Sequence, residues 1–385
     1  MRLLVVSASY PPMLSGVALV AQFLAVEAAK NGIDTTVLTS QKNPEIDDKN
    51  KNLKVIQLPG RKNPFRSNSH INLMAPNSIK KILDQISPDV IHFHDPLLTS
   101  VQIALLAKKT PKIFTEHGSS KFVLSYLPKI FQVKQADSLV WHYFAWFGNQ
   151  CQLVTTPTKT VLKILRDFGL NANGIAVSNG MDLREFSPTN QSKARLKRKL
   201  GWPDKFIFYY HGRIDPDKNL DVLINVIPQM MVAHNNIHFV ISGGKSSTRS
   251  KLETLAVQLK IDHHVTWTDP HLSDRIGEYR AADCFVISSI IETQSLVTLQ
   301  ALATGLPVVA ADALALPELV IPHKNGWLFE PDSLPALFQA LSKILSASKI
   351  ELYRMSEESL KIAKQHDRKQ TVKKYLQLYE GLIKA

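Results

Sequence analysis

Short runs of apolar residues alternate along the chain with longer stretches in which apolar residues recur every three or four positions. Residues 17–31 have this longer, helical spacing and end at Gly32, a typical helix stop. The short runs are bounded by polar or turn residues, as buried β-strands are. They lie at residues 3–7, 35–39, 55–58, 90–93, 113–115 and 153–156. Strands that alternate with helices predict a parallel sheet with crossover helices.

The same alternation returns in the second half of the chain, after turn residues between positions 178 and 188. A basic stretch at residues 193–199 is interpreted as a solvated helix face, and residues 220–233 have helical spacing. Further strands are predicted at residues 206–212, 238–242, 265–268, 284–288 and 307–311. The terminal stretch, residues 356–385, predicts one or two helices. The sequence therefore predicts two α/β units of similar size, each with its ligand crevice at the carboxyl ends of its strands.

Composition narrows the class of protein. The chain has 385 residues, of which 44% are apolar and 21% charged, which excludes a mostly disordered chain and a coiled coil. Its two cysteines cannot build a disulfide framework and fit a reducing compartment. The chain has no uninterrupted apolar stretch of about 18 residues, so we predict no membrane-spanning helix. The net charge of +13 favours anionic partners, namely nucleic acid, an anionic membrane or phosphorylated substrates. We find no nucleic-acid motif and expect no such partner.

Three predicted strand ends in the first half contain candidate functional residues. Gly16 follows the first strand and opens a helix, so it could form a phosphate site or an ordinary turn. His92 and His94 share one face of a strand, and His117 lies at the next strand end. The three could bind a metal that activates water for hydrolysis, or they could be partly buried structural residues. A histidine at this edge can also transfer protons near neutral pH.

The segment after residue 212 contains candidate phosphate ligands in the second half. Arg213 and Lys218 follow a predicted strand, and together they could neutralise a diphosphate leaving group. Asp215 and Asp217 form a pair that could bind a divalent metal. Because Arg213 and Lys218 would already neutralise the phosphates, helix capping by the two carboxylates is favoured instead. Further along, Glu292 lies in a polar loop before a helix, where it could accept hydrogen bonds from sugar hydroxyls. A capped surface helix is the competing interpretation of that loop.

Five motifs occur in a fixed order along nearly the whole chain. They are Tyr10-Pro11-Pro12 with Gly16, Pro88-Asp89-Val90-Ile91-His92-Phe93-His94, Asn179-Gly180-Met181-Asp182 with Phe186-Ser187-Pro188, Gly212-Arg213 with Lys218, and residues 292–305 followed by Pro307-Val308-Val309-Ala310. With them the chain resembles the retaining glycosyltransferases of family four, which have the GT-B fold. The resemblance implies two Rossmann-like doubly wound domains that face each other across a cleft. Residues 1–180 would bind the acceptor, residues 181–365 the nucleotide sugar, and a helix at 366–385 would pack back on the N-terminal domain.

The resemblance also implies how the donor phosphates would be bound. Gly16 would approach them from the N-terminal domain, and Arg213 and Lys218 would neutralise the departing diphosphate. Backbone N–H groups near Ser295 and Leu296 would hold the distal phosphate. The donor would be a UDP- or GDP-linked sugar, and the transfer of its hexose would retain the anomeric configuration and need no metal or other cofactor.

For the sugar and nucleoside, the resemblance implies a second set of residues. His117 would lie beside the sugar at the reaction centre, and Glu292 and Gln294 would contact the sugar. Gly243 would lie near the nucleoside. The family has glutamate at the position of Gln300, where it holds the ribose hydroxyls. An amide can still form those hydrogen bonds, but weaker donor affinity and a degenerate or regulatory role stay open.

The resemblance identifies the acceptor less precisely than the donor. Residues 292–294 and 315–319 resemble members that glycosylate diacylglycerol or polyprenyl-linked acceptors. Residues 121–146 interleave lysines with aromatic residues, which suits an anionic bilayer surface or a buried helix pair that lines the acceptor cleft. We predict a hexosyltransferase that acts in glycolipid or polysaccharide biosynthesis on a membrane lipid or glycan precursor, in the cytoplasm or peripherally on the cytoplasmic face of a membrane. The alternatives are a soluble acceptor such as a sugar phosphate and, more remotely, a metal hydrolase that uses His92, His94 and His117.

Overall fold

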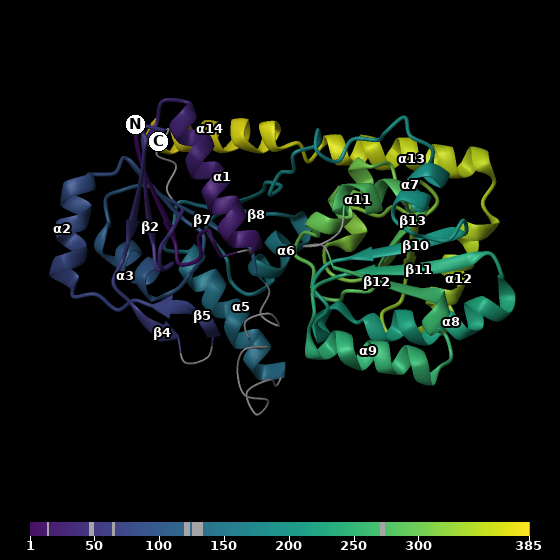
Figure 1. Cartoon of the computed structure of the whole chain (residues 1–385). Coiled ribbons are helices and arrows are strands. Elements are labelled where there is room, and N and C mark those ends of the chain that lie inside the picture. The colour runs from purple at the N-terminus through teal and green to yellow at the C-terminus, as the bar shows by residue number, and fades with distance from the viewer. Residues whose placement is uncertain are drawn as a thin grey trace. The chain divides into compact units, whose positions relative to one another are not determined.

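The computed structural model describes residues 1–13, 15–45, 50–63, 66–118, 124, 134–269 and 274–384, without the side chains of 61–63, 66–71, 134 and 135. The chain divides into two compact units (Figure 1). The first, unit 1, consists of Met1–Asn179 and Lys369–Ala385, and the second, unit 2, of Gly180–Arg368. Each contains one parallel sheet, so the predicted fold class of two parallel-sheet α/β units is confirmed.

Unit 1 is built on a seven-stranded sheet in the order β3-β2-β1-β6-β7-β8-β9. Every neighbouring pair in this sheet is parallel. The strands are β1 (Arg2–Ser7), β2 (Asp34–Thr39), β3 (Leu53–Gln57), β6 (Val90–Phe93), β7 (Lys112–Thr115), β8 (Leu153–Thr156) and β9 (Asn173–Ala176). Six of them match the predicted apolar runs. The edge strand β9 and an antiparallel hairpin of β4 (Arg61–Asn63) and β5 (Arg66–Ile71) were not predicted, because none of these segments has a run of apolar residues in the sequence.

Six helices accompany this sheet in the described part of unit 1. They are α1 (Gly16–Lys30), α2 (Pro76–Ile86), α3 (Leu98–Leu106), α5 (Lys134–Gly148), α6 (Lys159–Asp167) and α14 (Arg368–Lys384). The first of them begins at Ser15, whose side chain accepts a hydrogen bond from the N–H of Ala18 and so caps the helix. The last returns from the far end of the chain and buries its tyrosines in a core formed with β1 and α1.

A buried polar network joins α14 to the middle of the unit 1 sheet. The hydroxyl of Tyr379 lies 2.8 Å from Nδ1 of His92, and Nε2 of that histidine lies 2.6 Å from Oγ1 of Thr115. The hydroxyl of Tyr375 lies 3.1 Å from the same threonine and 3.0 Å from Oγ1 of Thr155. Buried polar groups are costly without partners, so this network fixes where α14 lies on the sheet.

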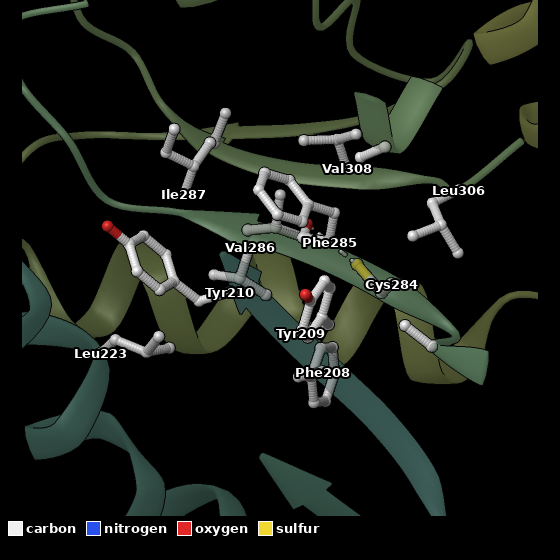
Figure 2. Close-up of a cluster of buried hydrophobic side chains, with 14 of the residues drawn as sticks. Phe208, Tyr209, Tyr210, Leu223, Cys284, Phe285, Val286, Ile287, Leu306 and Val308 are labelled. Carbon is white, nitrogen blue, oxygen red and sulfur yellow. Dashed lines mark hydrogen bonds between the residues drawn. The ribbon is translucent and has the colours of Figure 1, made fainter. Parts of the chain in front are cut away.

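Unit 2 repeats the same architecture with a six-stranded parallel sheet in the order β12-β11-β10-β13-β14-β15. Its strands are β10 (Phe206–His211), β11 (Ile237–Ser242), β12 (Val265–Thr268), β13 (Cys284–Ile287), β14 (Val308–Ala311) and β15 (Gly326–Phe329). Five of the six were predicted. Figure 2 shows the centre of the core, where side chains of β10 and β13 pack with Leu223, Leu306 and Val308.

The helices of unit 2 cover both faces of its sheet, with α7 and α11 on one side and α8 and α9 on the other (Figure 1). The α-helices are α7 (Lys193–Lys199), α8 (Leu220–Ala233), α9 (Ser247–Gln258), α10 (Arg275–Ala281), α11 (Leu296–Ala303), α12 (Leu334–Ser346) and α13 (Lys349–Lys364). The interpretation of α7 as a solvated basic face is wrong for Lys197. Its ammonium is buried and lies 2.7 Å from a carboxylate oxygen of Asp283.

Replacement of Tyr379 by phenylalanine tests the anchor of α14. Tyr379→Phe leaves Nδ1 of the buried His92 without its partner, so we expect the free energy of unfolding to fall by about 1–2 kcal/mol. Chemical denaturation of the whole chain measures this change. The matched control is Tyr353→Phe, because Tyr353 is 66% exposed on α13. Equal unfolding free energies for the two variants would contradict the anchor.

Candidate functional site

Three segments of unit 2 follow adjacent strands and emerge at one edge of the sheet. Arg213 and Lys218 follow β10, Gly243 follows β11 and Glu292 follows β13. Strand β10 lies between β11 and β13, and all three are parallel. Their carboxyl ends therefore meet at the same edge, which is where open α/β sheets bind ligands.

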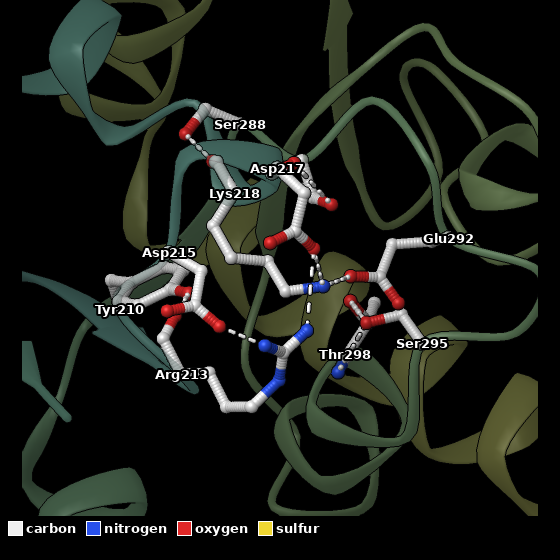
Figure 3. A network of polar contacts seen from close by, with 10 residues as sticks. Tyr210, Arg213, Asp215, Asp217, Lys218, Ser288, Glu292, Ser295 and Thr298 are labelled. Carbon is white, nitrogen blue, oxygen red and sulfur yellow. Dashed lines mark hydrogen bonds and ion pairs between the residues drawn. The ribbon is translucent and has the colours of Figure 1, made fainter. Parts of the chain in front are cut away.

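Lys218 lies at the centre of this edge (Figure 3). Its ammonium is 2.8 Å from Oε1 of Glu292 and 3.0 Å from Oδ2 of Asp217. The lysine and both carboxylates are largely buried, with side-chain exposures of 13–18%. Burial alone lowers the pKa of Lys218, but the carboxylates of Glu292 and Asp217 outweigh it and raise the pKa above its usual value. Lys218 is therefore positively charged, and its two carboxylate partners fix the position of its ammonium group.

Short side-chain contacts fix the loop on which Lys218 lies. The 3-10 turn η2 (Pro216–Lys218) ends in Lys218, whose carbonyl accepts a hydrogen bond of 2.9 Å from the hydroxyl of Ser288. The hydroxyl of Tyr210, in β10, donates to the carbonyl of Arg213 at 2.7 Å. The two ends of the loop are thus tied to β10 and to the residue after β13.

Arg213 forms ion pairs with Asp215 and Asp217 (Figure 3). The prediction that these carboxylates cap a helix is wrong. Asp215 is the N-cap residue of η2 but makes no side-chain capping bond, and the N-cap residue of helix α8 is Asn219. The two basic residues attract the carboxylates more strongly than a neutral backbone N–H does, because both partners are charged. Arg213, which remains exposed, and Lys218 thus share Asp217.

The predicted phosphate-binding helix start is the N-terminus of α11. Ser295 is its N-cap, and its buried hydroxyl accepts a hydrogen bond of 3.3 Å from the N–H of Thr298. Leu296 is the first helical residue, and the side chain of Gln294 is buried just before it. Because most residues of α11 are buried, the competing interpretation as a surface helix is wrong. The free N–H groups of such a helix end favour an anion.

Gln300 lies further along α11. Its amide oxygen is 3.0 Å from the hydroxyl of Tyr279, a buried residue of α10. That hydroxyl also lies 3.1 Å from the carbonyl of Val297. Tyr279 was not identified from the sequence, because a tyrosine in a helix gives no signal of what its hydroxyl meets.

The two predicted glycines have different surroundings. A Cβ atom added to Gly243 would lie 2.5 Å from the carbonyl oxygen of Gly212, so packing within unit 2 already requires glycine there. A Cβ added to Gly16, the first residue of α1, would meet nothing within 4 Å. The described neighbours of Gly16 leave open space at this helix start.

In unit 1, the strand ends of β6 and β7 bring two predicted residues together. Nδ1 of His94 lies 2.9 Å from Nε2 of His117, and the two rings stack with centroids 5.2 Å apart. Burial lowers the pKa of His117 to about 4, although a hydrogen bond with Asn179 opposes this shift. Both rings are neutral at neutral pH, so one donates its N–H to the other.

His92 does not fit the predicted metal site. It lies on the same strand face as His94, with ring centroids 4.1 Å apart, as its spacing predicted. However, Tyr379 and Thr115 occupy both of its ring nitrogens, so neither lone pair is available to a metal. Among the residues that the structure describes, no group of three or more His, Cys, Asp or Glu side chains could hold a metal ion.

Two carboxyl groups, the buried Glu116 and the partly buried Asp95, flank the histidine pair, and neither was singled out from the sequence. Oε1 of Glu116 accepts a hydrogen bond of 2.6 Å from the N–H of Gly118, while Oε2 has no partner within the described part of the chain. Burial raises the pKa of Glu116 to about 8. Asp95 accepts hydrogen bonds from the N–H groups of Ala8 and Leu97 and from the hydroxyl of Ser100.

Much of the predicted basic and aromatic segment lies outside the described residues. This applies to residues 121–123 and 125–133, and the side chain of Lys134 is likewise not described. In the described part, Trp141 and Phe144 are buried, whereas Tyr143 and Trp146 are 38% and 43% exposed. No described helix is long and apolar enough to cross a membrane.

Comparison with known families identifies the class of protein. Residues 14–185 match the family model described as Glycosyltransferase Family 4, and residues 192–362 match the one described as Glycosyl transferases group 1. Together the two matches span most of the chain. The protein belongs to these glycosyltransferases, and its fold is of the GT-B type.

Individual relatives cover nearly the whole chain. D-inositol 3-phosphate glycosyltransferase of Corynebacterium glutamicum is 26% identical, over 93% of this chain and 90% of its own. Alpha-monoglucosyldiacylglycerol synthase of Acholeplasma laidlawii is 25% identical, over 86% of this chain and 85% of its own. The solved structure of HepE from Anabaena, in complex with UDP, has a TM-score of 0.79 at 17% identity, over 99% of this chain and 100% of its own. This last likeness supports the fold.

Replacement of Glu116 by glutamine tests its burial as a neutral acid. The folded state holds the proton of Glu116 up to about pH 8, whereas the unfolded state releases it near 4.5. The wild-type protein therefore loses stability as the pH rises through this window, and Glu116→Gln does not share this loss. We expect the unfolding free energy of the variant minus that of the wild type to increase by at least about 1.4 kcal/mol between pH 5 and 8. This figure corresponds to one pKa unit. Glu380→Gln, on an exposed part of α14, is the control. An advantage that does not change with pH would show that Glu116 ionises normally.

Proposed function

We propose that the protein transfers a hexose from a UDP- or GDP-linked donor to an acceptor hydroxyl, with retention of configuration and without a metal. The observation on which the proposal chiefly rests is the buried Lys218 ammonium between Asp217 and Glu292, with Arg213 beside it. A departing nucleoside diphosphate gains negative charge as the glycosidic bond breaks. Fixed cations at that point stabilise the transition state more than the ground state.

In this proposal the charge is supplied by the chain's own side chains. The diphosphate replaces the carboxylates as the partner of Lys218 and Arg213, because a phosphate bears more charge than one carboxylate. Glu292, released from Lys218, then turns to the hydroxyls of the donor sugar. The N–H groups at Ser295 and Leu296 hold the distal phosphate, and Gly16 leaves space for it. Two cationic side chains take the part that a divalent ion plays in other transferases.

The remaining site residues orient the sugar and nucleoside. His117 is neutral at physiological pH, so it acts as a hydrogen-bond partner beside the sugar rather than as a charge. Gln294 contacts the sugar, Gly243 lies near the nucleoside, and Gln300 binds the ribose hydroxyls. The departing phosphate assists removal of the acceptor proton on the same face of the sugar, which accounts for retention.

For the acceptor we propose a membrane lipid or glycan precursor, bound by unit 1. The name of the Acholeplasma relative, a monoglucosyldiacylglycerol synthase, supports a lipid. The exposed Tyr143 and Trp146 on α5 fit peripheral attachment to the cytoplasmic face of a membrane. A soluble sugar phosphate is the second candidate, and the name of the Corynebacterium relative supports it.

Substitution of Lys218 tests the donor site. Lys218→Ala leaves the diphosphate charge without its buried partner, so we expect transfer to fall about 10²- to 10³-fold. The assay is nucleoside-diphosphate release from a panel of UDP- and GDP-sugars, with a chelator present and with or without membrane lipid. Lys199→Ala removes only an exposed pair with Asp274 and is expected to retain wild-type activity. Turnover by Lys218→Ala at the wild-type rate would remove this residue from the mechanism.

Substitution of Gln300 tests the ribose contact. Gln300→Glu places a carboxylate where the family has one, and it can still accept the hydrogen bond from Tyr279. We expect unchanged or tighter donor binding, measured as the calorimetric Kd for the nucleoside diphosphate. A severalfold weaker Kd would place Gln300 away from the ribose.

A further inference from the structure

Unit 1 contains a cavity of about 130 Å³ at the carboxyl edge of its sheet. Residues at the ends of β1, β2 and β3 form one side of it, among them Ser7, Leu38 and Leu58. The loop from Asp95 into α3 forms another side. No described side chain that we assign to the donor lines this cavity. Its size suits a ligand group of about six non-hydrogen atoms, because an engineered cavity of similar volume in another protein holds benzene.

Asn72 lines this cavity with an unpaired amide. Its side chain is 3% exposed, and neither its nitrogen nor its oxygen has a hydrogen-bond partner in the described structure. Only its backbone carbonyl is engaged, by the hydroxyl of Thr99 at 3.1 Å. An unpaired buried amide destabilises a protein, and native proteins contain few of them. A ligand with a hydroxyl group would satisfy both atoms, because a hydroxyl both donates and accepts.

The charges at the cavity exclude an anionic ligand. The described residues that line it include no Lys, Arg or His, and they include the partly buried Asp95. The carboxylate of Asp95 already accepts three hydrogen bonds, and these bonds fix its position at the cavity. A phosphate brought beside this carboxylate would be desolvated without a cation to compensate it, which is strongly unfavourable. The ligand group is therefore uncharged.

The rim of the cavity is apolar and exposed. Leu97 and Leu98 line the cavity and are 51% and 47% exposed. The surface continues onto α5, because the hydroxyl of Tyr143 donates to the carbonyl of Pro96. Trp146 stacks on Tyr143 with ring centroids 5.8 Å apart. An apolar stem attached to the polar group in the cavity would contact this rim.

We propose that this cavity is the acceptor subsite and that it takes the uncharged, hydroxyl-bearing head of a neutral acylglycerol lipid, whose chains lie on the apolar rim. This assignment rests on the proposed function and selects among its acceptors. It favours a neutral lipid over the sugar phosphate, with Asn72 as the residue that recognises the hydroxyl.

Binding without any donor tests the assignment directly. The probe is a short-chain 1,2-diacylglycerol below its micellar concentration. The comparison ligands are phosphatidylglycerol with the same chains and inositol phosphate. We expect the diacylglycerol to bind most tightly, and Asn72→Leu to weaken its Kd at least tenfold. Asn77→Leu, an exposed asparagine five residues away on α2, is expected to bind as the wild type does.

A second readout separates recognition from folding. Asn72→Leu removes an unpaired buried amide, so we expect it to melt at or above the wild-type temperature while it binds the probe more weakly. If its larger side chain prevents folding, Asn72→Ala replaces it in the same assay. Tighter binding of either phosphorylated ligand, or an unchanged Kd in a folded Asn72 variant, would overturn the assignment.

Nucleoside-diphosphate release distinguishes this assignment from the proposed function. Diacylglycerol binding without sugar transfer from any donor would contradict the proposed function and leave the cavity as a lipid site. Transfer to inositol phosphate without diacylglycerol binding would contradict the cavity assignment and leave the donor chemistry intact.

Discussion

Parallel strand pairing is the constraint on which both halves of this protein depend. In a parallel sheet every strand ends at the same edge, so residues far apart in the chain become neighbours if each follows a strand. In unit 2 this rule brings Lys218 to Glu292 across 74 positions, with 2.8 Å between their charged atoms. In unit 1 it brings His94 to His117. The crossover helices bury both faces of such a sheet, and they leave the carboxyl edge as the place where polar side chains can converge.

The two edges differ in charge, and the difference suggests a division of labour. The edge of unit 2 has cations held by carboxylates, and an incoming anion can exchange for those carboxylates while the buried Lys218 stays paired. The edge of unit 1 has neutral histidines and acids, with no described cation at its cavity. A nucleoside diphosphate suits the first environment and an uncharged hydroxyl suits the second. A transferase needs both environments, because the nucleoside diphosphate of its donor leaves as an anion and its acceptor attacks through a hydroxyl oxygen.

The requirements of stability and of ligand binding conflict at a few buried polar groups. Tyr379 pairs with His92, Tyr375 pairs with Thr115 and Thr155, and these hydrogen bonds anchor α14. The side-chain amide of Asn72 has no partner in the described structure, and Glu116 retains one unpaired oxygen, although both side chains are buried. Packing gives no reason to keep a polar side chain at either place. Residues of this kind are expected where a protein binds a ligand, because there the missing hydrogen bonds come from outside the chain.

The sequence by itself determined the fold class, most strands and the donor motif, because hydrophobic period and turn residues are local signals. It also placed Arg213, Lys218 and Glu292 in segments that follow predicted strands, and so at a carboxyl edge. Only the tertiary structure decided how polar groups are paired. In it, Asp217 pairs with Lys218 instead of capping a helix, and the buried Lys197 pairs with Asp283. Both ring nitrogens of His92 have hydrogen-bond partners. The tertiary structure also left the side-chain amide of Asn72 unpaired beside a cavity. A hydrogen bond depends on which atoms meet within about 3 Å, and residue type and spacing do not specify that for residues distant in the chain.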